Sequence, residues 1–264
     1  MVQMPNTAGA STRRTARALR HVAALALVVA AGLPLPACRD AIARKYEYEE
    51  DVYLRLDGSA TVYVNAAVPA LVALRDAPLP LDPSARLDRN DVREFYQGPG
   101  VTVGSVSLSR REGRRYVHLR LEVDDIRRLG ERPPFAWSRY QFVDRGGLWV
   151  FLQEMTAAAG KDVGNVGWQG NELVAVRLHL PSRIPFHNAP SRTVERGNIL
   201  SWEQPLTARA KGEPIAIEVH MEQDSILFQT LALFAGMALL ALAALALFVW
   251  WVRRMGAPRA PVQP

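Results

Sequence analysis

Several segments of the chain alternate apolar and polar residues with a period of two. Apolar side chains take every second position in 117–123, 174–180 and 215–221, and mostly charged, histidine or alanine residues stand between them. Successive side chains of a strand point to opposite faces, so this pattern is typical of strands buried on one side. These segments predict a largely antiparallel sheet.

The segments between the alternating stretches contain signals for tight turns. Asp57–Gly58 follows the alternating residues 52–56, and Glu112–Gly113 precedes the segment 117–123. An acidic residue followed by glycine favours a two-residue hairpin, because both positions adopt positive φ. The alternation changes phase near Gly104, which indicates a β-bulge.

Signals for helices are few and short. Pro69 stands at an early helical position, and Asp88 or Asn90 can cap a second helix. Together with the strands they predict an α+β domain, and the expected helices cover residues 69–75, 90–96 and 124–129.

Two expected strands, 135–143 and 148–155, carry large apolar side chains on both faces and are separated by a turn at 144–147. A strand that is apolar on both faces needs cover on both. Either it lies centrally in the core, or it lines a cavity for an apolar ligand. The second interpretation makes five aromatic residues candidate ligand-binding residues: Trp137, Tyr140, Phe142, Trp149 and Phe151.

A long uncharged segment near the C-terminus, 226–252, predicts a transmembrane helix. At about 1.5 Å per residue it reaches roughly 40 Å, which exceeds the ~30 Å hydrocarbon layer. Trp250 and Trp251 stand at its end, followed at once by Arg253 and Arg254. Indoles favour the membrane interface and basic residues the cytoplasmic side, so 253–264 is expected to be a cytoplasmic tail.

The N-terminus resembles a secretory signal. Four arginines between residues 13 and 20 precede the apolar segment 22–35, which is short for a membrane span. We expect residues 1–37 to be a signal peptide, with a retained membrane helix as the alternative. Either case places 38–224 on the outer face of the membrane, with the C-terminal membrane helix at 225–252. With the signal peptide removed, the protein is single-pass.

The end of this signal also resembles the lipobox of bacterial lipoproteins. Leu35, Ala37 and Cys38 match its pattern, and Pro36 departs from it. The resemblance implies a lipid on Cys38, and the alternative is a plain signal peptide with an incidental cysteine. As the single cysteine of the chain, it excludes a disulfide within the chain and a zinc site with several cysteines.

The charge of the chain lies at its ends. The formal net charge is +6, and seven of the 32 Lys and Arg residues flank the two apolar segments, leaving 25 against all 26 acidic residues in 39–224. The middle domain is therefore almost neutral. With the domain outside the cell, we expect no nucleic-acid partner.

No motif for catalysis or cofactor binding is present. The sequence lacks the nucleophile, phosphate-loop, zinc-protease and dinucleotide patterns. Converging histidines could hold a metal, but most of them occupy polar positions of alternating strands, where solvent exposure is expected: His118, His179, His187 and His220. We therefore expect no enzyme, no metal and no cofactor.

Four arginines surround the predicted turn at Glu112–Gly113: Arg110, Arg111, Arg114 and Arg115. Basic residues close to a membrane contact anionic headgroups, which makes these four candidate headgroup contacts. The alternative is a solvated hairpin whose charge prevents edge-to-edge aggregation.

The segment 174–219 carries a family resemblance. It combines the strand VAVRLHLPS with a Gly197-Asn198-x-x-x-Trp202 stretch, a last strand and then the membrane helix. With the lipobox-like start and the early DGSATVYV hairpin, this plan resembles the LppM-type bacterial lipoproteins. The resemblance implies a helix-grip-like fold with an apolar, lipid-binding groove, and it transfers no site residues.

Two functions follow as hypotheses. The first is a non-enzymatic, membrane-anchored module of the bacterial envelope that binds a lipid or another apolar ligand. The alternative is a protein-interaction or scaffold component of an envelope complex, for which Ala232 and Gly236 would permit close packing of membrane helices.

Overall fold

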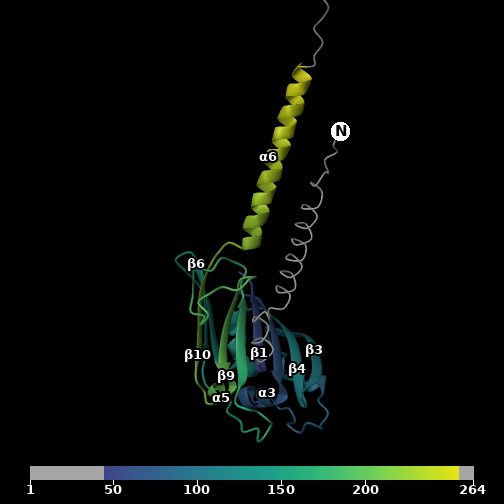
Figure 1. Ribbon diagram of the computed structural model, residues 1–264, viewed down its shortest axis with the longest axis vertical. Coiled ribbons are helices and arrows are strands. Elements are labelled where there is room, and N and C mark those ends of the chain that lie inside the picture. Colours follow the sequence, from purple (N-terminus) through teal and green to yellow (C-terminus); the bar gives the residue numbers. More distant parts are fainter. Residues whose placement is uncertain (1–44, 256–264) are drawn as a thin grey trace, which may run out of the picture. The chain divides into compact units, whose positions relative to one another are not determined.

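The computed structural model describes residues 45–255, and its strands form two sheets (Figure 1). The larger sheet has the order β3-β4-β2-β1-β7-β9, in which β1 and β7 run parallel and the other neighbours antiparallel. Its strands are β1 (Lys45–Leu54), β2 (Ala60–Ala67), β3 (Val101–Arg111), β4 (Arg114–Val123), β7 (Glu172–His179) and β9 (Ile199–Pro205).

The smaller sheet has four antiparallel strands in the order β5-β6-β10-β8. They are β5 (Ser138–Arg145), β6 (Leu148–Met155), β8 (Phe186–His187) and β10 (Ile215–Glu222). The alternating segments of the sequence correspond to β1, β4, β7 and β10, so the predicted α+β class with mainly antiparallel sheets is confirmed.

The predicted turns and the bulge are also present. The first hairpin joins Leu54 to Ala60 through a turn longer than two residues, in which Gly58 but not Asp57 has positive φ. The Ser59 backbone N–H donates to the Asp57 carboxylate at 2.9 Å. In the second hairpin, Glu112 and Gly113 both have positive φ, of 49° and 76°, as a two-residue turn requires. The bulge appears as a shift of register between Val103 and Ser105.

The helices form at or near the expected places. In α4 (Arg89–Tyr96) the Asp88 carboxylate accepts from the Asn90 N–H at 2.8 Å, as a cap should. The third expected helix is the 3₁₀ helix η2 (Ile126–Glu131). The first expected helix is α3 (Val68–Arg75). The sequence did not predict η3 (Pro133–Phe135) or α5 (Leu206–Ala210), because neither is long enough to show an apolar period.

Helix α3 lies in the middle of the core. All eight of its residues are buried, and it contacts β1, β2, β4 and α5. A helix that is apolar on every side must be covered on every side. Its end is fixed by Asp76, which takes the left-handed conformation at φ 55° and donates its backbone N–H to the Val72 carbonyl. Both sheets contribute residues to the same hydrophobic core.

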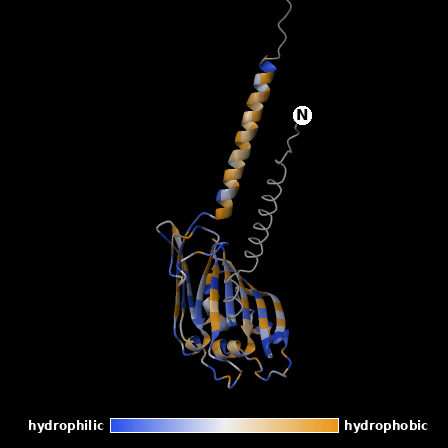
Figure 2. Cartoon of the chain, viewed as in Figure 1, coloured by the Kyte–Doolittle hydropathy of each residue, from blue (hydrophilic) through white to orange (hydrophobic). Residues whose placement is uncertain are grey.

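Helix α6 (Ile226–Met255) is the predicted membrane segment. It has 30 residues and no buried residue, and an 18-residue stretch within it has a mean hydropathy of 2.6 (Figure 2). By length and composition it can cross a membrane. The expected signal peptide, Cys38 and the end of the expected basic tail lie outside the described residues.

Candidate functional site

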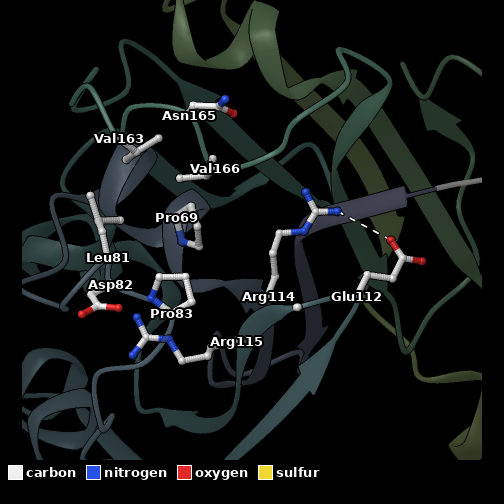
Figure 3. Close-up of a pocket in the computed structure, with 11 residues that line it drawn as sticks. Pro69, Leu81, Asp82, Pro83, Glu112, Arg114, Arg115, Val163, Asn165 and Val166 are labelled. Carbon is white, nitrogen blue, oxygen red and sulfur yellow. Dashed lines mark ion pairs between the residues drawn. The ribbon is translucent and has the colours of Figure 1, made fainter.

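A cavity of about 440 Å³ lies beside the tip of the β3–β4 hairpin (Figure 3). The start of α3, the loop after α3 and the loop between β6 and β7 complete its walls. The lining residues are Pro69, Leu81, Asp82, Pro83, Glu112, Gly113, Arg114, Arg115, Val163, Asn165 and Val166.

Apolar side chains from three separate segments form one part of this lining. Pro69 comes from α3, Leu81 from the following loop, and Val163 and Val166 from the loop before β7. Leu81 and Val163 also pack against the hydrophobic core. An apolar wall with a few polar groups beside it is typical of small-molecule sites. No sequence pattern predicted this wall, because Leu81, Val163 and Val166 lie in loops without periodicity and Pro69 belongs to a different segment, α3.

Arg115 holds one side of the cavity in place. It is 8% exposed, and its guanidinium donates to the backbone carbonyl oxygens of Ala85, at 2.8 Å, and Pro80. Arg110 donates to the Pro83 carbonyl at 2.8 Å. Burial, with the charge of Arg110, lowers the pKa of Arg115 below that of a free arginine. These two arginines therefore fasten the loop after α3 to the hairpin.

Arg114 faces the acidic side of the same region. Its Nη2 lies 3.2 Å from Glu47 and 3.7 Å from Glu112, and its Nη1 lies 4.0 Å from Glu172 (Figure 3 shows the pair with Glu112). Its side chain is 12% exposed, and Nε and Nη1 have no hydrogen-bond acceptor among the described residues. These two nitrogens of Arg114 are themselves buried, so a ligand reaches them only after a neighbouring group moves.

Glu47 is the buried carboxylate that lies nearest to Arg114. Burial raises the pKa of Glu47, although Arg114 and hydrogen bonds from Tyr116 and Trp168 oppose that rise. The Tyr116 hydroxyl donates to Glu47 at 3.1 Å, and Arg111 donates to the Tyr116 oxygen at 3.3 Å. The four arginines expected to contact headgroups therefore divide: Arg110 and Arg111 are exposed, whereas Arg114 and Arg115 point into the fold.

The five aromatic residues expected to bind a ligand lie elsewhere. They do not line this cavity but pack in and against the core, where Phe142 and Trp149 stack with ring centroids 4.6 Å apart. Four of the five are buried: Trp137, Tyr140, Phe142 and Phe151. The structure therefore shows them in the packing role that the sequence allowed, and a ligand-binding role for them stays a prediction.

A buried polar cluster adjoins two of these aromatic residues, and sequence reasoning missed it. Glu50 and Arg75 are fully buried and form an ion pair at 2.9 Å, and the Tyr48 hydroxyl donates to the same Glu50 oxygen at 2.8 Å. The Trp137 ring centroid lies 3.4 Å from the Arg75 guanidinium carbon. Glu50 shares the inward register of Tyr48 and Val52 on β1, a signal from which the cluster could have been found.

The histidines remain on polar positions. His118 lies 2.8 Å from the Ser109 hydroxyl, and His179 stacks on Tyr53 at 3.8 Å. Across residues 45–255, no group of three or more His, Cys, Asp or Glu residues is arranged to hold a metal ion.

Comparison with known proteins gives a distant structural likeness. No family model matches the sequence, and no curated protein matches it. Among solved structures, the chain is similar to the NMR structure of the folded domain of Mycobacterium tuberculosis LppM. The two share 11% identity and a TM-score of 0.37 over 68% of this chain and 91% of the other. That domain is therefore a weak structural neighbour of this chain.

Proposed function

We propose that the protein is a membrane-anchored module of the bacterial envelope that binds an acidic amphiphile, such as an anionic lipid, without catalysing a reaction. Its domain faces the outer side of the cytoplasmic membrane in this proposal. The observation that carries it is the cavity of about 440 Å³, which joins an apolar wall to arginine side chains.

The size and lining of the cavity suit part of an acyl chain. Its volume falls within the range of small-molecule sites, about 300–1,000 Å³. Pro69, Leu81, Val163 and Val166 offer apolar surface there. Each methylene that leaves water for such a surface contributes about 0.8 kcal/mol, so five of them contribute about 4 kcal/mol.

Arg114 supplies the polar half of the site. Its Nε and Nη1 have no acceptor within the described part of the chain, and its side chain is only 12% exposed. An arginine fork matches a phosphate or carboxylate group and binds it through charge-assisted hydrogen bonds. Glu112 is 60% exposed and lies 3.7 Å from Arg114, so it can move aside for such a group.

The apolar helix α6 supports the same proposal. A domain tethered to a bilayer meets its lipids at a high effective concentration, so a modest intrinsic affinity is sufficient for occupancy. Arg110 and Arg111 lie near the start of β7, whereas Ile226 of α6 donates to Pro181 beyond the end of β7. Headgroup contacts by these two exposed arginines therefore stay a separate prediction.

The test is native mass spectrometry of the full chain in nonionic micelles, with phosphatidylglycerol or phosphatidylcholine of identical acyl chains. The proposal predicts a one-to-one complex that favours phosphatidylglycerol. Val166→Trp fills the cavity and should abolish the complex, whereas the matched control Val194→Trp, at a residue 41% exposed and outside the cavity lining, should leave it intact. Equal lipid binding by both variants, or none by the wild type, would contradict the proposal.

A further inference from the structure

Arg209 is a buried cation without a carboxylate partner among the residues that the structure describes. Its residue surface is 0% exposed, and its Nη1 donates to the backbone carbonyl of Glu213. Its Nε and Nη2 are buried and have no hydrogen-bond acceptor among residues 45–255, and no acidic residue of that range forms an ion pair with it. Burying a guanidinium without a charge partner lowers the stability of the folded state, unless an anion binds to it.

A second arginine lies close to Arg209. The guanidinium carbons of Arg75 and Arg209 lie 3.4 Å and 4.8 Å from the centroid of the Trp137 ring. Arg75 is neutralised by Glu50, but its Nε and Nη1 are also buried without an acceptor in the described chain. The two arginines and the glutamate thus leave one positive charge in excess.

The charge of Arg209 persists at neutral pH. Burial, with the nearby charge of Arg75, lowers the pKa of Arg209 to about 10. The group is therefore still protonated under physiological conditions. Its two unaccepted nitrogens, together with those of Arg75, present N–H donors of the kind that bind oxyanions.

We propose that Arg209, Arg75 and Trp137 form a buried binding site for an oxyanion, namely a phosphate or carboxylate group. The site is separate from the cavity beside the hairpin, because Arg75 ends α3 whereas the cavity touches Pro69 at its start. Trp137, which the sequence suggested as a ligand-binding residue, here positions the two guanidinium groups.

The loop after β6 lies beside the end of α3 and the end of α5, the elements that carry Arg75 and Arg209. The Ala159 and Lys161 N–H groups donate to the Leu74 and Ala73 carbonyls at 3.1 and 3.3 Å, and Lys161 pairs with the exposed Asp76. A Cβ placed on Gly160 would lie 4.0 Å from the Ala210 carbonyl, so the same loop also reaches α5. Ala158, Val163 and Trp168 of this loop pack against the hydrophobic core, so an anion enters only when the loop opens locally.

The test measures the thermal midpoint and calorimetric binding of the full chain in nonionic micelles at constant ionic strength. The probes are inorganic phosphate, decanoate and phosphatidic acid, each compared with chloride. The wild type should be stabilised by at least one probe, and Arg209→Met should lower that affinity at least about tenfold, as expected for the loss of charge-assisted hydrogen bonds. The exposed Arg145→Met is the matched control and should bind like the wild type.

The anion-free thermal midpoint separates a binding role from a structural one. Without a probe, Arg209→Met should melt no lower than the wild type, because the substitution removes an uncompensated buried charge. If that variant does not fold, Arg209→Lys, which keeps the charge, should retain a weaker response to the probe. The site is refuted if no probe stabilises the wild type, or if Arg209→Met or the folded Arg209→Lys binds as tightly as the wild type. Response to phosphate alone identifies a free anion, to decanoate a fatty acid, and to phosphatidic acid alone a lipid headgroup.

Discussion

Replacing Glu50 with glutamine removes the carboxylate that neutralises Arg75 inside the core. Both side chains are 0% exposed and their charged atoms lie 2.9 Å apart. Breaking a buried pair on one side leaves an uncompensated charge and costs about 3–5 kcal/mol. Domains of this kind are stable by about 5–15 kcal/mol, so the substitution should remove a large part of that free energy of unfolding.

A neighbouring pair provides the matched control. Glu49 and Arg177 also lie 2.9 Å apart, but their side chains are 25% and 24% exposed. Because water screens this pair, Glu49→Gln should cost less than about 1 kcal/mol. The ion pairs of Glu49 and Glu50 therefore have the same length, and the two glutamates differ in how deeply they are buried.

The assay is urea unfolding of the full chain in nonionic micelles, followed by near-ultraviolet circular dichroism. Combining Glu50→Gln with Arg75→Met removes both charges, so the double variant should be more stable than the sum of the single changes predicts, by at least about 1 kcal/mol. A loss below about 1 kcal/mol for Glu50→Gln, or strictly additive single changes, would refute the reasoning.

Three further changes test other parts of the fold by the same unfolding assay. Leu71→Ala, in the fully buried α3, should cost about 2–5 kcal/mol, and a smaller loss would show that the core closes around the gap. Gly130→Ala would place a Cβ 2.5 Å from the Ser138 carbonyl oxygen and should cost about 1–3 kcal/mol, whereas wild-type stability would contradict this close approach. Asp125→Ala removes the cap of η2 and should cost about 1 kcal/mol at neutral pH. The hydrogen bonds and charge of Arg127 lower the pKa of Asp125 in the folded state. The stability that Asp125 contributes is therefore fully present above its pKa in the unfolded chain and should disappear as pH falls through its pKa in the folded protein. A stability difference between the wild type and Asp125→Ala that persists below that pH would refute the assignment.

The elements that the sequence predicted are those with a local cause. Alternation identified β4, β7 and β10, because each buries one face along most of its length. The turn at Glu112–Gly113 was predictable because two adjacent residues had to adopt positive φ. The assignment of strands to two sheets was not predictable from local patterns. It depends on pairings such as that of β1 with β7, whose residues lie more than a hundred positions apart.

The candidate site shows the same division. The sequence showed the four arginines at the hairpin as a cluster. It could not predict that Arg114 and Arg115 are largely buried. The apolar wall joins Pro69, Leu81 and Val166 from three segments, and no local pattern links them. Arg209 belongs to a five-residue helix, where periodicity cannot reveal a buried face.

A photoactivatable anionic lipid measures the central claim most directly. The lipid carries its reactive group on the acyl chain and is incorporated in bilayer discs with the full protein, and crosslinked peptides are then identified by mass spectrometry. The cavity predicts crosslinks in two loop segments, 80–83 and 163–166, in addition to those expected along α6. These loop crosslinks should disappear in Val166→Trp and persist in Val194→Trp. Crosslinks confined to α6 would contradict a lipid-binding domain.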